Sequence, residues 1–306
     1  MKKILFMGTP DYATKIFEEI LNNSNYELVG LFTQPDKKVG RKQILTAPHI
    51  KQFCIDKNLD IPIFQPEKLR KNEEAKNQII DLKPDFIIVA AYGQILPKDI
   101  LDIAPCINLH ASLLPKYRGA SPIQESLLND DFYTGVTSML MEEGLDSGDI
   151  LGLQYLKITS SMEVSEAFEK LSKIAAKLTI TTLDNYENIK PIKQNESEVS
   201  FCKKIKKDDG LVNFSNAKNL YLKYKAYSYW PGIFLESELK LKDINLVETD
   251  SVNEEGKILE ISKNFIVIGC KKGSLKIATL QAPSKKAISS VDYIRGQRLE
   301  VGDLLS

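Results

Sequence analysis

Short apolar runs alternate with helix-like segments through the first two-thirds of the chain, and this alternation limits the possible folds more than any other feature. Runs such as Ile4–Met7 and Phe86–Ala91 are apolar throughout, which is typical of strands buried on both faces of a sheet. Segments with helical periodicity separate most of them, and Val164–Tyr186 is a long example. Strands that alternate with helices predict the α/β class, here a Rossmann-like, mainly parallel sheet with helices on both faces.

The sequence changes character near residue 190. Residues 190–207 are polar and rich in lysine without a clear period, as expected of a basic linker. One helical segment, Ala217–Tyr227, and several short alternating segments follow: Ile233–Leu239, Gly256–Ile261, Phe265–Cys270 and Leu275–Leu280. They predict a small OB-like β-barrel. We therefore expect a catalytic domain in residues 1–189, the linker in 190–207 and a C-terminal domain in 208–306.

The 41 basic and 41 acidic side chains cancel, so the chain as a whole carries no net charge that would attract a nucleic acid. A polyanionic partner would have to meet a local basic patch. The four cysteines lie far apart and form neither a CxxC pair nor a cluster with histidine, which argues against a zinc site and a disulfide framework. We therefore expect no metal.

The N-terminal apolar run is too short for a signal peptide, and no later run reaches the length of a membrane span. These features predict a cytoplasmic protein. We also expect a monomer, because no heptad pattern or exposed apolar stripe calls for a second copy. Gly8 follows the first strand without the two further glycines of a dinucleotide-binding turn, which argues against a dinucleotide site.

Polar side chains lie at the end of the short apolar run that closes with His110, one of only two histidines in the chain. Alternate residues of a strand share a face, so Asn108 and His110 point to the same side, at the carboxyl end where such sheets bind ligands. Downstream, Asp146 stands between Gly144 and Gly148. We expect these glycines to permit the backbone angles that turn the carboxylate into a cleft.

An amide, an imidazole and a carboxylate without a serine or cysteine nucleophile indicate direct attack of an external nucleophile on a carbonyl group. Asn108 can donate a hydrogen bond to the developing oxyanion. His110 can donate another when protonated or remove a proton when neutral, and Asp146 would orient the imidazole. Taken singly, each residue also has a structural explanation: a satisfied histidine of a core strand, a turn-forming aspartate and an asparagine capping a strand end.

The surrounding sequence favours the catalytic interpretation. Residues 106–122 read CINLHASLLPKYRGASP, and residues 143–149 read EGLDSGD. Both segments resemble the signature of the 10-formyltetrahydrofolate-dependent formyltransferase family, in which Asn-x-His and Ser-Leu-Leu-Pro are diagnostic. The resemblance covers essentially the whole chain. It implies that Asn108, His110 and Asp146 are the catalytic residues.

The same resemblance implies that the formyl donor is 10-formyltetrahydrofolate, with no metal involved. It assigns the folate to two strand-end loops, and Gly93 in the first of them would expose backbone groups to a flat pterin. The implied folate-binding residues are Ala91, Tyr92, Gly93, Gln94, Ile95, Leu96, Ser112, Leu113, Leu114 and Pro115.

Three features favour methionyl initiator tRNA as the acceptor of the formyl group. Residues 6–13 resemble the N-terminus of methionyl-tRNA formyltransferases, and residues 225–232 resemble their Arg-Ala-x-x-x-Trp-Pro-Gly segment, with Lys225 in place of the arginine. Residues 33–42 form a loop rich in basic side chains, suited to phosphate contact. The resemblance implies tRNA contacts from Lys37, Lys38, Arg41 and Lys42.

Three alternatives remain at this stage. A nucleotide amino-sugar N-formyltransferase would share the folate chemistry but would need a pocket for a nucleotide diphosphate. A formyltetrahydrofolate hydrolase would use water in place of the amine and leave the basic loop without a role. A non-catalytic RNA-binding protein would not need Asn108, His110 and Asp146.

Overall fold

The computed structural model describes residues 1–40 and 42–305 and divides the chain into two compact units. The first unit comprises Met1–Pro122, Tyr133–Lys157 and Phe168–Cys202. The second comprises Ile123–Phe132, Ile158–Ala167 and Lys203–Ser306. Arg41, one of the predicted tRNA contacts, lies outside the described residues.

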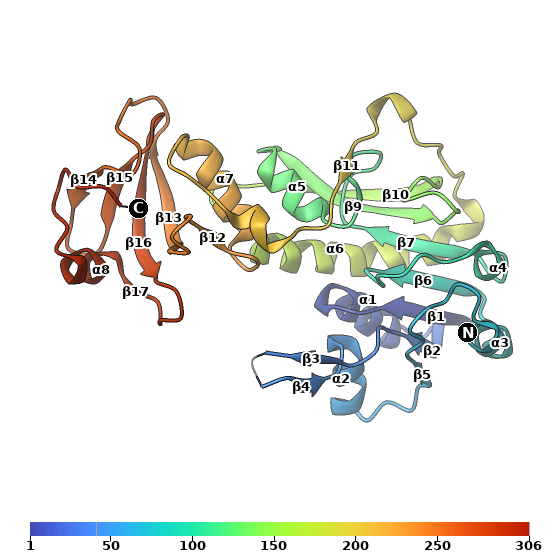
Figure 1. Cartoon of the computed structure of the whole chain (residues 1–306). Coiled ribbons are helices and arrows are strands. Elements are labelled where there is room, and N and C mark those ends of the chain that lie inside the picture. Colours follow the sequence, from blue (N-terminus) through green and yellow to red (C-terminus); the bar gives the residue numbers. More distant parts are fainter. Residues whose placement is uncertain (41, 306) are drawn as a thin grey trace. The chain divides into compact units, whose positions relative to one another are not determined.

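A seven-stranded sheet forms the centre of the first unit (Figure 1). The strand order is β10-β9-β7-β6-β1-β2-β5. The five strands of this sheet that come first in the chain pair in parallel; they are β1, β2, β5, β6 and β7. In contrast, β9 runs antiparallel to both β7 and β10. The predicted, mainly parallel α/β sheet is thereby confirmed. Its strands are β1 (Lys2–Gly8), β2 (Tyr26–Phe32), β5 (Ile63–Phe64), β6 (Phe86–Ala90), β7 (Cys106–His110), β9 (Tyr133–Leu140) and β10 (Ile150–Lys157).

Helices cover both faces of this sheet because successive side chains of its strands point to opposite sides. On one face, the ring of Phe6 in β1 packs edge-on against Phe17 of α1, with ring centroids 5.4 Å apart. On the other face, Leu5 and Met7 join a buried cluster with residues of α3 and α4. The helices of this unit include α1 (Asp11–Leu21), α2 (His49–Asp56), α3 (Glu73–Leu82) and α4 (Lys98–Leu101), and most of α6 (Val164–Asn185) belongs to it.

The sequence around residue 72 defines the start of α3. Asn72 is its N-cap, and its side-chain oxygen accepts a hydrogen bond from the amide of Ala75 at 3.0 Å. Glu73 and Glu74 place negative charge in the first turn, where the helix dipole favours it. The helix ends at Lys83, whose left-handed backbone stops the helical path.

A short antiparallel hairpin follows β2. It consists of β3 (Lys37–Val39) and β4 (Ile44–Thr46), and every residue described in these two strands is exposed. Figure 1 shows it standing away from the seven-stranded sheet, next to α2. This hairpin corresponds to the basic loop singled out in the sequence.

The second unit is an antiparallel β-domain, as predicted, and the predicted helix Ala217–Tyr227 appears as α7. Its strand order is β12-β13-β16-β15-β14, with β17 paired to β16. The strand predicted at residues 233–239 is shorter, and the strand that follows it was missed because charged and apolar residues mix in its sequence. The elements are β12 (Ile233–Phe234), β13 (Lys240–Glu248), β14 (Ile258–Ile261), β15 (Ile266–Gly269), β16 (Ser274–Gln281), β17 (Ile288–Ser289) and α8 (Ser290–Gln297).

Shorter elements complete the chain. They are α5 (Pro122–Leu128), the two-residue strands β8 (Arg118–Gly119) and β11 (Phe201–Cys202), and three 3-10 turns at Tyr186–Asn188, Glu196–Glu198 and Lys207–Gly210. Over the part of the chain that the structure describes, none of the helices combines the length and apolar character needed to cross a membrane.

Candidate active site

Asn108 and His110 lie at the carboxyl end of β7, and both side chains reach the loop that carries Asp146. Asn108 is half-buried, whereas the side chain of His110 is only 6% exposed. The sequence therefore located two side chains on the same face of the strand, as the alternation of strand residues requires. Their burial protects the polar contacts described below from bulk water.

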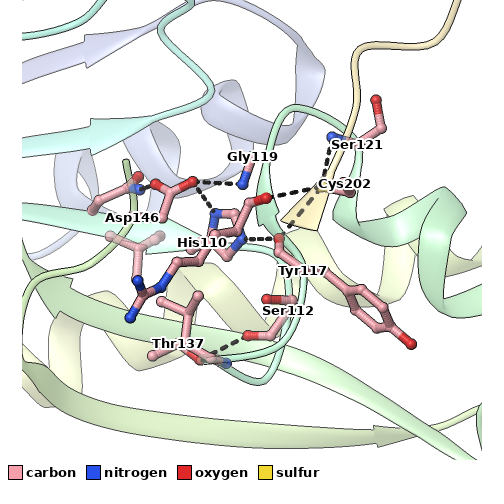
Figure 2. A network of polar contacts seen from close by, with 12 residues as sticks. His110, Ser112, Tyr117, Gly119, Ser121, Thr137, Asp146 and Cys202 are labelled. Carbon is pink, nitrogen blue, oxygen red and sulfur yellow. Dashed lines mark hydrogen bonds and ion pairs between the residues drawn. The ribbon is translucent and has the colours of Figure 1, made fainter. Parts of the chain in front are cut away.

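The carboxylate of Asp146 is held by three groups from β7 and the short strand β8 (Figure 2). The amide N–H of Gly119 donates a hydrogen bond to Oδ2 at 2.9 Å. Nδ2 of Asn108 donates to Oδ1 at 3.3 Å, and Nδ1 of His110 lies 3.6 Å from Oδ2. These contacts fix the direction in which the carboxylate of Asp146 points, next to the imidazole ring.

The orientation of the His110 ring is fixed from its other nitrogen. Nε2 lies 2.9 Å from the main-chain oxygen of Tyr117. A carbonyl oxygen can only accept a hydrogen bond, so Nε2 must carry the proton, and Nδ1 is the nitrogen that faces Asp146. The site therefore presents an imidazole whose Nδ1 edge faces the carboxylate of Asp146.

The glycines around Asp146 act differently from the sequence expectation. The left-handed backbone belongs to Asp146 itself, with φ of 48°, whereas Gly144 and Gly148 do not have positive φ angles. They are needed for close approach: a Cβ on Gly148 would lie 1.8 Å from the main-chain oxygen of Leu140, and one on Gly144 would lie 2.0 Å from Oγ of Ser147. These glycines therefore provide space for close contacts, and the strained backbone conformation belongs to Asp146 itself.

The predicted folate segment 112–115 is a tight turn held by Thr137 of β9. Oγ1 of Thr137 donates to the main-chain oxygen of Ser112 at 2.7 Å and accepts from the amide of Leu114 at 3.0 Å. Oγ of Ser112 donates to the oxygen of Lys116 at 2.6 Å. Thr137 has no signal in the sequence, because a threonine in an apolar strand looks like any other strand residue.

The other predicted folate segment, 91–96, follows β6 and is anchored at both ends. The main-chain oxygen of Tyr92 accepts hydrogen bonds from Oγ1 of Thr9 and Nε2 of Gln34, at 3.0 and 3.2 Å. The side chain of Gln94 accepts from the amide of Leu69 and donates to the oxygen of Pro66, at 2.8 and 2.9 Å. These anchors hold a loop in which Ala91, Gly93 and Ile95 are exposed and Tyr92 and Leu96 are buried.

The loop's exposed backbone is available for a ligand. Ala91 and Gly93 have positive φ angles of 45° and 85°, which turn the chain outward. Among the described residues, the amides of Gly93 and Ile95 have no hydrogen-bond partner. The side chain of Ile95 is 79% exposed. Exposed amides beside an exposed apolar side chain suit a flat, polar-edged aromatic ligand.

The basic hairpin presents Lys37, Lys38 and Lys42 to solvent. Its base is fixed by Asp36, whose carboxylate accepts from Nζ of Lys51 at 2.9 Å and from Nε2 of Gln65 at 2.8 Å. The hydrogen bond from Gln65, followed by that from Lys51, holds the pKa of Asp36 below its usual value. The hairpin is thus anchored at its start while its lysines remain exposed.

Several residues around the site were missed by the sequence analysis. They lie in Arg118–Gly119 and in the polar segment 190–202, and they include Arg118, Gln194, Glu196, Ser200 and Cys202. A polar stretch without periodicity gives no signal of such contacts, because they depend on where the chain returns in space. Within residues 1–40 and 42–305, no group of three histidine, cysteine or acidic side chains is arranged to hold a metal ion.

Two family models match the chain. The model described as formyl transferase matches residues 2–183, and the model described as formyl transferase, C-terminal domain, matches residues 204–298. Methionyl-tRNA formyltransferase of a Nitratiruptor species is 61% identical over 98% of this chain and 99% of its own length. The enzymes of the same name from Wolinella succinogenes and Campylobacter lari are 52% and 54% identical, each over 100% of both chains.

Solved structures share the fold at much lower identity. An N-formyltransferase from Helicobacter canadensis, in complex with folinic acid and dTDP-3-aminofucose, has a TM-score of 0.68 at 17% identity, over 92% of this chain and 100% of that one. HypX from Aquifex aeolicus, in complex with tetrahydrofolic acid, has a TM-score of 0.63 at 15% identity, over 99% of this chain and 48% of that one. At such identities the likeness establishes the fold alone.

Proposed function

The chain belongs to the methionyl-tRNA formyltransferases, a family of folate-dependent enzymes, and on that premise we propose its reaction and the residues that perform it. It transfers the formyl group of 10-formyltetrahydrofolate to the free α-amino group of methionyl initiator tRNA. The new amide bond forms as the bond between the formyl carbon and N10 breaks, the amine loses one proton and N10 gains one. The products are N-formylmethionyl-tRNA for translation initiation and tetrahydrofolate. The observation that carries the assignment of the site is the contact of Asp146 with both Asn108 and His110 at the carboxyl end of β7.

Asn108 stabilises the charge that develops on the formyl oxygen when the amine attacks the formyl carbon. Its Nδ2 has two N–H bonds, and the contact with Asp146 occupies one of them. The side chain is half-buried and reaches the surface of the sheet edge. The second N–H is therefore a donor fixed in advance, as oxyanion stabilisation requires.

His110 and Asp146 act as a pair. The carbonyl of Tyr117 holds Nε2, so Nδ1 is the only ring nitrogen that can serve the reaction. Its distance of 3.6 Å from Oδ2 of Asp146 is longer than a hydrogen bond, which leaves Nδ1 able to donate to the formyl oxygen. The carboxylate, together with the carbonyl of Tyr117, sets the orientation of the imidazole. None of these steps requires a metal.

The folate binds to the loops 91–96 and 112–115, which follow the adjacent strands β6 and β7. The free amides of Gly93 and Ile95 and the exposed side chain of Ile95 support this placement. Bound there, the co-substrate supplies the activated formyl group. The chain's own contribution is to hold it at the end of β7, because Thr137 fixes the turn at Ser112.

The hairpin β3–β4 contacts the phosphates of the tRNA through Lys37, Lys38 and Lys42, together with Arg41. The lysines are exposed, and Asp36 fixes the base of the hairpin from which they project. Lysine and arginine side chains supply the sequence-independent part of RNA affinity. We assign the enzyme to one copy of the chain, since all the proposed catalytic groups come from a single unit.

Formyl transfer from 10-formyltetrahydrofolate, measured with methionyl initiator tRNA and in parallel with an amino-sugar nucleotide, tests the proposal. We expect rapid transfer to the tRNA that weakens as salt rises. Transfer to the sugar alone would keep the site and overturn the acceptor. Formate release without transfer to either acceptor would identify a hydrolase instead.

A further inference from the structure

The main chain of Asp146 adopts a conformation that needs support. Its left-handed φ of 48° is a conformation that residues with a side chain adopt infrequently. Its neighbours in the loop, from Glu142 to Leu145, are exposed and cannot hold it by packing. Whatever fixes this backbone also fixes the direction in which the carboxylate points.

Gln194 holds this backbone from outside the loop. Its Nε2 donates hydrogen bonds to the main-chain oxygens of Asp146 and Gly148, both at 2.8 Å. The side chain is 8% exposed, so water does not compete effectively for these two oxygens. Gln194 thus bridges the main chain of the loop between Asp146 and Gly148.

Arg118 fixes which way the amide of Gln194 points. Nε of Arg118 donates to Oε1 of Gln194 at 3.0 Å, and Nη2 donates to Oε1 of Glu196 at 2.8 Å. A flipped amide would set its oxygen against two carbonyl oxygens and its NH₂ group against the guanidinium. The buried guanidinium therefore permits only the orientation that supports Asp146.

The segment around Arg118 also holds the carboxylate itself, since the next residue, Gly119, donates its amide to Oδ2 of Asp146. This segment is itself held by Ser200. The amide of Tyr117 donates to Oγ of Ser200, and the amide of Arg118 donates to the main-chain oxygen of Ser200, both at 2.9 Å. The segment Arg118–Gly119 thus supports Asp146 in two ways. Arg118 holds the main chain of Asp146 through Gln194, and Gly119 binds the carboxylate directly.

We infer that Gln194, oriented by Arg118, is a positioning residue that sets the geometry of Asp146 and through it the rate of formyl transfer. The inference rests on the proposed catalytic role of Asp146. Neither Gln194 nor Arg118 needs to touch a substrate for this role. A misplacement of a catalytic group by about 1 Å can cost on the order of 100-fold in rate.

Two substitutions of Gln194 separate its contact with Arg118 from its hydrogen bonds to the loop carbonyls. Gln194→Met keeps the length of the side chain and removes its hydrogen bonds. Gln194→Glu keeps the contact with Arg118 but sets a carboxylate against the carbonyls of Asp146 and Gly148. We expect kcat to fall about 10- to 100-fold in the first and further in the second, while KM for the folate changes less than about twofold, because the folate loops are untouched.

Gln281→Glu is the matched control. Nε2 of Gln281 donates to the main-chain oxygen of Lys285 at 2.9 Å in the second unit, so the same chemical change is made at a carbonyl of the unit that does not contain Asp146. We expect its kcat to equal that of the wild type. Circular dichroism and thermal unfolding establish that each variant is folded. If Gln194→Met does not fold, Arg118→Lys tests the same path, because lysine has one donor nitrogen in place of the two fixed guanidinium nitrogens that bind Gln194 and Glu196.

A double-mutant cycle with Asp146→Asn distinguishes positioning from a general structural effect. If Gln194 acts through Asp146, Gln194→Met should lower kcat far less in the Asp146→Asn background than in the wild type. Equal losses in both backgrounds would overturn the inference, as would a folded Gln194→Met enzyme with normal kcat. If Asp146→Asn itself kept the wild-type rate, the proposed catalytic role would fall first, and the positioning role with it.

Discussion

The loop around Asp146 and the hairpin β3–β4 differ in how firmly the rest of the chain holds them. Asp146 receives hydrogen bonds from Asn108 and Gly119 on its carboxylate and from Gln194 on its main chain. The hairpin strands pair only with each other, and every residue described in them is exposed. An isolated two-stranded hairpin is marginally stable in water.

On the roles proposed for these two regions, this difference shows how the two tasks of the enzyme are divided. Stabilising a developing charge requires donors fixed in advance, since reorganisation during the reaction would cost free energy. Attracting a polyanion requires positive charges, whose effect depends weakly on exact position. Substitutions in the Asp146 loop should therefore act mainly on kcat, and substitutions in the hairpin mainly on the apparent affinity for tRNA.

The largest expected effect is that of Asp146→Asn. The substitution keeps the size of the side chain but removes the charge that orients His110, so we expect kcat to fall about 100- to 10,000-fold. His110→Ala should cause a loss of the same order. Single-turnover rates at saturating substrates measure both. A folded Asp146→Asn enzyme with a near-normal rate would contradict the proposal that the Asp146 loop serves catalysis and the hairpin serves binding.

A pair of glycine substitutions tests the contrast in rigidity. In Gly148→Ala, the new Cβ would lie 1.8 Å from the oxygen of Leu140, so the loop must shift, and we expect kcat to fall on the order of 100-fold. Gly40→Ala in the hairpin meets no atom within 4 Å, although its φ is +70°. We expect less than about a threefold change in kcat there. Similar losses in kcat for both variants would show that the hairpin is as rigid as the loop.

Removing the hairpin charges should affect binding. For Lys37/Lys38/Lys42→Ala we expect kcat/KM for the tRNA to fall about tenfold at moderate salt, with a shallower dependence on salt and little change in kcat at saturation. The control replaces three exposed lysines of α6, Lys170, Lys173 and Lys177, by alanine. Loss of kcat at saturating tRNA would contradict the proposed division.

The smallest expected effect is that of Asp36→Asn at the hairpin base. The pKa of Asp36 lies below its ordinary value of 3.8, so its ionised form stabilises the hairpin base fully above that pH. This contribution is lost only as the pH falls through the lowered pKa. At neutral pH we expect Asp36→Asn to raise KM for tRNA about two- to threefold and to speed amide hydrogen exchange in β3 and β4. Unchanged exchange would show that Lys51 and Gln65 do not secure the hairpin through Asp36.

The sequence by itself determined the α/β architecture and pointed to the segments to which we assign the chemistry. Apolar runs such as Ile4–Met7 mark buried strands, since only a strand buried on both faces of a sheet can be apolar without alternation. The two-residue period placed Asn108 and His110 on one face. The motifs around them indicated the family, because those segments are continuous in the chain.

The tertiary structure alone decided how the site is held. Gln194 lies in a polar stretch that composition interprets as a linker, yet it binds the carbonyl of Asp146, 48 residues earlier in the chain. The left-handed backbone at Asp146 is likewise held by a hydrogen bond from this distant segment. A hydrogen bond between such segments leaves no periodic trace, because its partners are chosen by proximity in space and not by spacing along the chain.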